Sequence, residues 1–308
     1  AVEGNLTILS VKGDMNHSAL ALGADGSPAT IGTVSIAGGL AGCNNDYAVD
    51  IVGNVGNFAV KGGMVATQLS VDGAVTSMSF GKGVYFSALG ISGATGALTV
   101  GTAVDNANLL FFEGIGSCTV KGSILNSEIG TTHYDGDGNP LGGRIDKLTA
   151  QDISGSSIYA FGGIGVLTSK GDITNSYIEA VGRNEADKDD REVDSVVGGG
   201  AIASIIAKGL NGTDVLAYTD VALVTLGDGG VSAGSAIEAM TGNFGSLKTT
   251  GIISGDILVD GNVTGSILSA GANAVAIDSA ADYYFLDASG LLTGGKLIVG
   301  GTIVGPVS

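Results

Sequence analysis

Apolar and polar residues alternate along this chain in a phrase that returns many times. Its consensus reads I-G-x-L-T-V-K-G-x-I-x-N-S-x-I, with apolar positions alternating on either side of a central glycine. Alternation with a period of two sends successive side chains to opposite faces of a strand. The phrase therefore predicts short β-strands throughout the chain. Its first half occurs at 55–62, 115–122, 164–171 and 244–251, and its second half at 122–129, 171–178, 251–258 and 261–268.

One position of the phrase holds only residues that tolerate a left-handed backbone. Glycine and asparagine adopt a positive φ at the least cost, and histidine is among the residues enriched there. We therefore expect a left-handed corner at the same point of every repeat. The residues at this position are His17, Asn126, Gly155, Asn175, Gly212, Gly255 and Gly265.

Short strands that end at a corner and return every ~20 to 25 residues predict a parallel β-helix. We expect an all-β, right-handed solenoid of about twelve coils that forms a single domain over 1–308. Two inserted loops, at about 131–143 and 182–200, interrupt the repeat, and an atypical coil covers about 269–292. A β-sandwich is the alternative, but it would not make the same corner recur in register.

Composition fits a slender core and narrows the partners. Glycine supplies 55 of 308 residues and 44% are hydrophobic, which excludes a disordered linker. The net charge of −17 repels phosphate backbones, so we expect no nucleic acid partner. No run approaches the ~18 apolar residues of a membrane helix, so we expect no membrane insertion.

The repeat resembles that of right-handed parallel β-helices in bacterial and archaeal cell-surface proteins, especially adhesins and autotransporter passengers. The resemblance covers nearly the whole chain and is specific for the fold. It implies an extracellular or cell-surface location. The chain opens with Ala1 rather than Met, which fits an exported protein whose signal peptide has been removed.

The first insertion carries a candidate calcium loop. Asp135, Asp137 and Asn139 follow a D-x-D-x-N spacing, and Asp146 stands at the twelfth position. Oxygen ligands at alternate positions of a tight loop can surround Ca²⁺, as in EF-hand loops. Pro140 replaces the usual glycine and an aspartate replaces the final glutamate. A turn rich in glycine and aspartate is the alternative interpretation.

The second insertion is the most charged stretch of the chain. A solvated loop is the simplest interpretation, and a protein contact or a weak cation site is the alternative. The acidic residues that would form such a site are Asp187, Asp189, Asp190 and Asp194.

Two cysteines differ in their place in the repeat. Cys118 falls at an inward-facing apolar position, and Cys43 falls at a corner position shared with Ser127 and Ser176. About four coils separate them, or ~19 Å at ~4.8 Å per coil, which is beyond disulfide reach. We expect two free thiols, with an intermolecular disulfide through Cys43 as the alternative.

Five lysines share the position before the central glycine, which would place them along one edge of the solenoid. As exposed charges they would increase the solubility of the protein. Alternatively, they would attract acidic side chains on the flank of a neighbouring copy. These residues are Lys12, Lys61, Lys121, Lys170 and Lys208.

Four N-x-S/T triplets are candidate N-glycosylation sites, and whether they are glycosylated depends on the host. They begin at Asn5, Asn16, Asn211 and Asn262.

Catalysis is not expected. The chain has three arginines and two histidines, and it lacks the G-H-G, N-T-D and R-x-P-x-x-R phrases of β-helical polysaccharide hydrolases and lyases. We expect no catalytic and no cofactor-binding residues. Ca²⁺ is the one candidate cofactor.

Two functions remain open. The repeat runs almost to both ends of the sequence without an evident cap, which favours head-to-tail self-assembly into a filament, sheath or surface layer. The alternative is an adhesin that binds a glycan, a protein or another cell-surface component. For that function, the dense aromatic groups are Phe111, Phe112 and Tyr283–Phe285.

Overall fold

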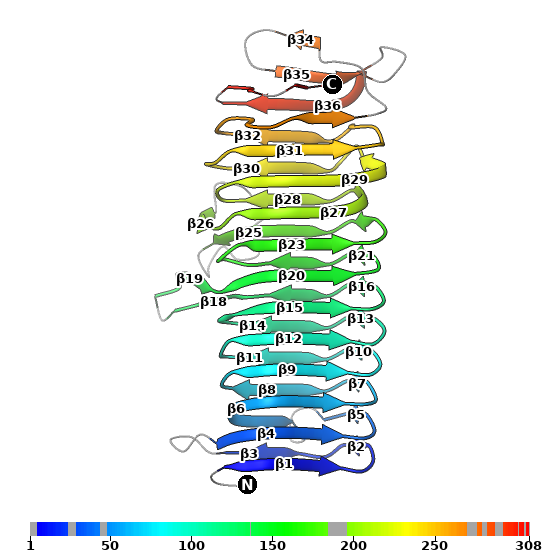
Figure 1. Ribbon diagram of the computed structural model, residues 1–308, viewed down its shortest axis with the longest axis vertical. Helices are drawn as coiled ribbons and strands as arrows, with labels where there is room; N and C mark the ends of the chain where they lie inside the picture. Colours follow the sequence, from blue (N-terminus) through cyan, green and yellow to red (C-terminus); the bar gives the residue numbers. More distant parts are fainter. Residues whose placement is uncertain are drawn as a thin grey trace. The chain divides into compact units, whose positions relative to one another are not determined.

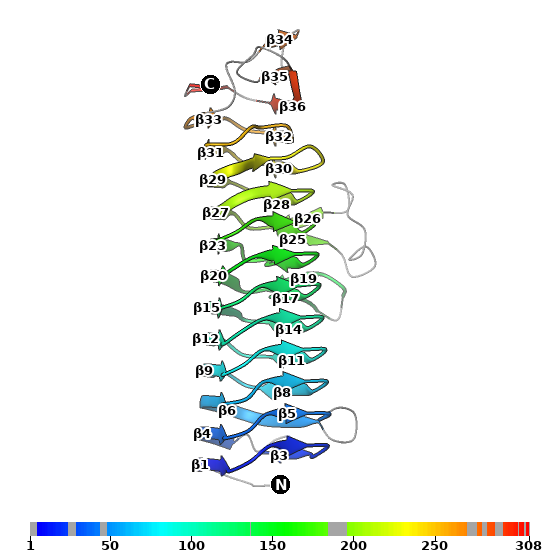
Figure 2. The ribbon, with the colours of Figure 1, turned by 90° about the vertical axis from the view of Figure 1, so that its right-hand side faces the viewer.

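The computed structural model is an all-β parallel β-helix (Figures 1 and 2). It describes residues 5–23, 29–43, 48–135, 137–183, 196–269, 276–278, 282–286, 292–300, 302–304 and 306–307. No helix occurs among these residues, and hence none that is long and apolar enough to cross a membrane. The chain divides into two compact units, Ala1–His133 with Gly142–Gln151 and Tyr134–Leu141 with Asp152–Ser308.

In the first unit, each long strand lies parallel to the equivalent strand of the next coil. Leu98, for example, pairs with Met78 on one side and with Cys118 on the other. The strands stacked in this way form one column: β1 (Leu6–Val11), β4 (Ala29–Ile36), β6 (Val49–Val60), β9 (Val75–Phe80), β12 (Thr95–Val100), β15 (Gly114–Val120) and β20 (Arg144–Ala150). The second half of β6 belongs to this column, and its first half belongs to the opposite sheet.

Two further columns complete each coil of the first unit. Two-residue strands form the turn: β2 (Met15–Asn16), β5 (Leu40–Ala41), β7 (Met64–Val65), β10 (Val84–Tyr85), β13 (Val104–Asp105) and β16 (Ile124–Leu125). The opposite sheet contains β3 (Leu20–Leu22), β8 (Gln68–Asp72), β11 (Ala88–Ile91), β14 (Asn108–Phe111) and β17 (Glu128–Gly130).

The second unit repeats the arrangement. Its long strands are β23 (Ile164–Ser169), β27 (Ile202–Asn211), β29 (Val221–Val231) and β31 (Phe244–Thr249), followed by the shorter β33 (Ile267–Ser269). The turn strands are β21 (Ile153–Ser154) and β24 (Ile173–Thr174). The opposite sheet contains β22 (Ser157–Tyr159), β25 (Tyr177–Arg183), β28 (Asp214–Ala217), β30 (Ala236–Ala239), β32 (Asp256–Val259) and β36 (Leu292–Val299).

These columns confirm the predicted fold class. Among the described residues, long strands mark seven coils in the first unit and four in the second, close to the expected twelve. From Met64 through Val84 and Val104 to Ile124, each turn residue lies beside the one twenty positions later. The arrangement is consistent with the right-handed coiling expected for parallel crossovers.

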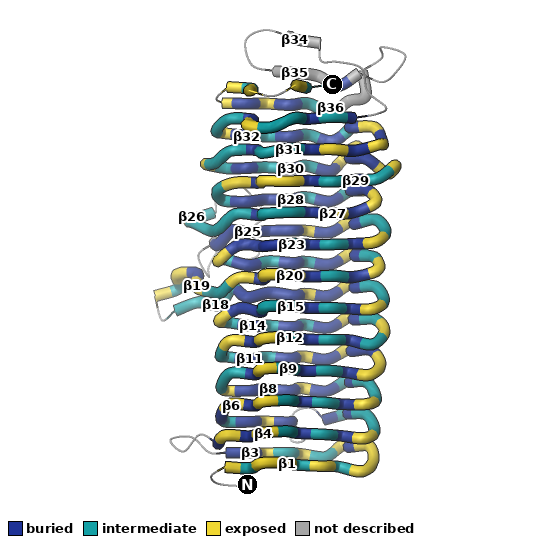
Figure 3. The backbone as a smooth tube through the Cα atoms, viewed as in Figure 1, coloured by how far each residue is buried: buried dark blue, intermediate teal, exposed yellow. Residues whose placement is uncertain are grey.

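The core follows from the alternation read in the sequence. Along β4, Ile31, Val34 and Ile36 are each at most 1% exposed, whereas the residues between them face outward. Figure 3 shows the same alternation on coil after coil. Large aromatic residues also fill the core: Phe58, Phe80, Phe111 and Phe244 are among the largest fully buried side chains.

The insertions and the atypical segment contain strands of their own. β18 (Thr132–Tyr134) and β19 (Pro140–Gly142) form a separate two-stranded sheet within the first insertion. At the second insertion, β26 (Val196–Gly199) pairs antiparallel with β25. Within 269–292, β34 (Ala276–Asp278) and β35 (Asp282–Leu286) pair antiparallel, and β35 pairs antiparallel with β36.

The predicted left-handed corner is confirmed in part. His17, Asn126, Gly155, Asn175 and Gly212 all have a positive φ between 46° and 58°. Gly255 and Gly265 do not, so the prediction is wrong for these two residues. The restriction on residue type is also wrong, because Ala66 and Phe86 occupy the same position with φ of 46° and 50°.

Candidate functional site

The predicted calcium loop forms a compact turn. The Asp135 carboxylate accepts hydrogen bonds from the backbone N–H groups of Asp137 and Asn139, both at 2.9 Å, and from the Asn139 side-chain amide. The hydrogen bond from the Asn139 backbone is the main cause of a lowered Asp135 pKa. This geometry holds a carboxylate in its ionised form at the centre of the turn.

The fourth predicted ligand has a different partner. Asp146 lies in β20 and forms an exposed ion pair with Arg144, with 3.2 Å between Oδ1 and Nε. Within the described residues, no three histidines, cysteines, aspartates or glutamates gather in a way that could hold a metal ion. The calcium loop therefore stays a prediction. The acidic residues 187–194 of the second insertion lie outside the described residues.

Both cysteines are free thiols and both are fully buried. Cys118 faces inward as predicted, and burial raises its pKa to about 12. Cys43 occupies the serine-like corner position, where its thiol lies 3.4 Å from the Met15 carbonyl oxygen and 3.6 Å from that of Ala41. Because its side chain is inaccessible, an intermolecular disulfide through Cys43 is not supported.

The lysine column is exposed but discontinuous. In the first unit, Gly81 and Gly101 occupy the equivalent position between Lys61 and Lys121, as the matching backbone hydrogen bonds show. In the second unit, Lys208 lies 3.9 Å from Asp228. All five lysines lie on the surface, so the charge is spread along the coils rather than concentrated at one site: Lys12, Lys61, Lys121, Lys170 and Lys208.

Three of the aromatic residues singled out from the sequence are buried or partly buried. Phe111 is fully buried in the core and Phe285 is 4% exposed. Phe112 is partly buried and packs against His133, with ring centroids 5.1 Å apart. The most exposed aromatic side chain among the described residues is Phe86, at 64%, whereas Tyr177 is 36% exposed. Aligning the corner positions would have found it, because Phe86 stands twenty residues before Asn106.

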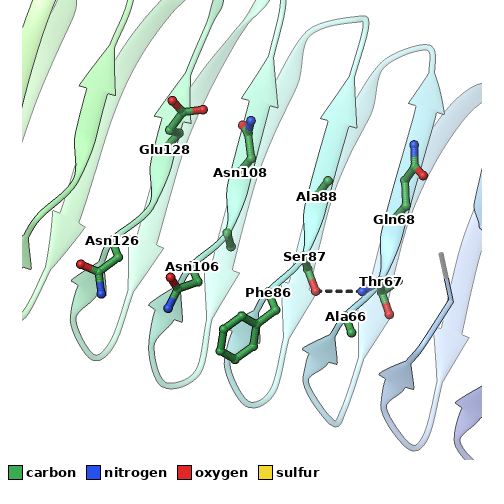
Figure 4. Close-up of a pocket in the computed structure, with 11 residues that line it drawn as sticks. Ala66, Thr67, Gln68, Phe86, Ser87, Ala88, Asn106, Asn108, Asn126 and Glu128 are labelled. Carbon is green, nitrogen blue, oxygen red and sulfur yellow. Dashed lines mark hydrogen bonds between the residues drawn. The ribbon is translucent and has the colours of Figure 1, made fainter. Parts of the chain in front are cut away.

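Phe86 belongs to a shallow groove of about 570 Å³ that crosses four coils of the first unit (Figure 4). Two parallel rows of side chains line it. Ala66, Phe86, Asn106 and Asn126 form the corner row, and Gln68, Ala88, Asn108 and Glu128 form the strand row.

Buried hydroxyl groups fix the floor between these rows. The Ser87 hydroxyl donates to the Tyr85 carbonyl oxygen at 2.7 Å and accepts from the Thr67 backbone N–H at 3.1 Å. The Ser127 hydroxyl likewise donates to the Leu125 carbonyl oxygen and accepts from the Ala107 backbone N–H. These hydroxyl groups tie the coil of Ser87 to that of Thr67 and the coil of Ser127 to that of Ala107, directly beneath the groove.

A second candidate site is the outer edge of β1. Leu6, Leu9 and Val11 pair with Ile31, Val34 and Ile36, yet they are only partly buried whereas their partners are buried. Among the described residues, β4 is the ladder partner of β1, and the other edge of β1 has none. The first coil therefore presents apolar side chains and unpaired backbone groups.

The chain matches no family model, no curated protein and no solved structure.

Proposed function

We propose that this chain is an extracellular structural protein that self-assembles head to tail into a filament, sheath or surface layer. The observation that supports this proposal is the open edge of β1, with its partly exposed row of inward-facing apolar residues. A strand edge of this kind is a template for pairing with another chain. Solenoid coils bury their core only by stacking on a neighbour.

In the second unit, isolated bridges hold the last described coil. Ile303 and Val307 pair with Val263 and Ile267 in this way. Ile303 and Val307 are partly buried, whereas Val263 and Ile267 are fully buried. β35 covers the outer edge of β36 in the opposite sheet, so the head-to-tail contact we propose joins the β1 edge of one copy to Ile303 and Val307 of another.

The size of the contact predicts reversible assembly. Leu6, Leu9, Val11, Ile303 and Val307 would each gain about 1 kcal/mol on full burial. Association of two proteins costs roughly 4–15 kcal/mol in lost freedom. The apolar gain and this cost are similar, so ladder hydrogen bonds have to supply the remainder and the assembly should depend on protein concentration.

The test places a charge on the proposed contact. Leu9→Lys puts an ammonium group over the end of the core, which opposes pairing at a strand edge. Ile8→Lys is the matched control, since Ile8 is 63% exposed and faces outward from the same strand. Sedimentation velocity and negative-stain microscopy of the full chain should show fibres of constant width for the wild type and Ile8→Lys, and a monomer for Leu9→Lys.

Two results would contradict the proposal. One is a wild-type chain that stays monomeric at every concentration reached. The other is equal assembly of Leu9→Lys and the wild type, which would place the contact elsewhere. Circular dichroism of both variants establishes that each one is folded.

A second candidate function is that of a surface adhesin, which the resemblance to adhesins and autotransporter passengers suggests. The observation that favours it is the groove around Phe86, where an aromatic ring and amide side chains are exposed together. We expect neither function to involve catalysis. Calcium binding by Asp135, Asp137 and Asn139 would stabilise the first insertion under either one.

A further inference from the structure

Phe86 is unusual both in its backbone and in its exposure. Its φ of 50° is one that bulky residues rarely adopt, and its side chain is 64% exposed. Asn106 and Asn126 occupy the same corner with almost the same φ. An asparagine at 86 would relieve the strain and remove an exposed apolar ring. A strained residue that gains nothing from packing points to a function at that position.

The surroundings of Phe86 indicate the chemistry of its ligand. Among the described residues, amide side chains dominate the polar lining, Glu128 is its one charged group, and no cationic side chain lines the groove. Anionic ligands are therefore disfavoured, all the more so on a protein of net charge −17. A purely apolar ligand would cover the amides without pairing them, which costs free energy.

One side chain of the strand row has an unpaired polar atom. The Oδ1 atom of Asn108 is buried and accepts no hydrogen bond from the described residues. Buried polar atoms are nearly always paired, so a small rotation of the Asn108 amide toward a donor in the groove would be favoured. A hydroxyl group is such a donor.

The rows also repeat along the solenoid axis of the first unit. Gln68, Ala88, Asn108 and Glu128 are register partners in successive strands, so like positions recur once per coil, at ~4.8 Å. Figure 4 shows Phe86, Asn106 and Asn126 at successive corners and the strand row on the successive strands. A linear polymer with a short repeat can contact successive coils in the same way.

From these observations we infer that the groove of the first unit binds a neutral, linear oligosaccharide. One sugar stacks its apolar C–H face on the Phe86 ring. Its hydroxyl groups and those of the neighbouring sugars bond to Asn106 and Asn126 in the corner row and to Gln68, Asn108 and Glu128 in the strand row. The inference rests on the adhesin candidate and does not require self-assembly.

The experiment probes the full chain with an array of neutral linear hexasaccharides in gluco, manno and galacto configurations, and titrates the strongest binder by calorimetry. Phe86→Asn should weaken binding at least tenfold without lowering the melting temperature, because asparagine suits this corner. Phe86→Tyr should stay within threefold of the wild type. Asn108→Leu should weaken binding by a similar factor to Phe86→Asn.

Val65→Asn is the matched control. Val65 is 41% exposed and directly precedes the corner row, but it does not line the groove. Its replacement should leave binding unchanged.

Failure of the inference is distinguishable from failure of the adhesin candidate. Hexasaccharide binding that Phe86→Asn leaves intact overturns the groove as the site but keeps a glycan-binding function. No binding to any hexasaccharide overturns the inference, and adhesion of the wild type to whole cells then decides the adhesin candidate separately. A change in self-association on Phe86→Asn, without glycan binding, would assign the ring to a protein contact and overturn the inference.

Discussion

At the scale of single residues, burial sets the chemistry of Cys118. Its side chain is fully enclosed between Leu98 and Leu148, and desolvation raises its pKa from 9.0 to about 12. The thiolate is the reactive form of cysteine, so this thiol is inert in the folded protein. The unfolded chain ionises at lower pH than the folded one, which links this residue to the pH dependence of stability.

We predict that this linkage destabilises the protein in alkali. The raised folded-state pKa means that the unfolded state loses its proton first, so stability falls as the pH rises above 9.0. Between pH 8 and pH 10 the loss should be on the order of 1 kcal/mol. Cys118→Val should remove this part of the pH dependence in urea titrations. An identical slope for both proteins would contradict the raised pKa.

The pKa of Asp135 is shifted in the opposite direction to that of Cys118. Backbone and side-chain hydrogen bonds from Asn139 lower its pKa, so the carboxylate stays ionised to lower pH than usual. We predict that Ca²⁺ raises the melting temperature of the wild type and that a chelator reverses the effect. Asp135→Asn should abolish the response, whereas Asp50→Asn, which removes the same charge from the exposed face of β6, should keep it. A wild-type melting temperature indifferent to Ca²⁺ would refute the calcium loop.

At the scale of the coil, stability depends on how closely one backbone lies on the next. A Cβ atom on Gly101 would overlap the carbonyl oxygen of Gly81 in the preceding coil. The backbone N–H of Gly101 donates to Phe80 at 2.8 Å, so the two coils cannot separate without losing this bond. Lys61 and Lys121 stand at the equivalent position of other coils, so it is the local backbone spacing at Gly101, rather than the turn conformation, that leaves no room for a side chain.

We therefore predict different outcomes for two alanine substitutions. Gly101→Ala should destabilise the first unit by about 1–3 kcal/mol, because the backbone has to shift. Gly90→Ala in β11 meets nothing within 4 Å, so its effect should stay within about 0.5 kcal/mol. Thermal unfolding of the two variants side by side measures the difference. Equal losses would show that the coils adjust freely.

At the scale of the whole molecule, the proposed contact through β1 would make stability depend on protein concentration. Assembly through Leu6, Leu9 and Val11 would stabilise the folded state by mass action, so the melting temperature should rise with protein concentration. Leu9→Lys should remove this dependence and Ile8→Lys should not. The dependence thus gives a second measurement of the contact proposed for filament formation.

Much of this organisation was readable from the sequence. Alternation predicted the strands, the inward place of Cys118 and the parallel β-helix, because the pleat sends alternate side chains to opposite faces. His17, Asn126 and Asn175 predicted left-handed corners, since backbone preference is a property of the residue itself. These features depend on each residue and its immediate neighbours.

Other features were decided only by the tertiary structure. Cys43 is buried, Phe111 belongs to the core, and Phe86 is exposed in a groove that Asn108 also lines. In the second unit, β35 joins β36 in the antiparallel direction. Each of these depends on residues about twenty or more positions away that stacking or strand pairing brings alongside. The sequence by itself therefore determined the coil, and the contacts between coils and between paired strands decided which of its side chains remain available to a partner.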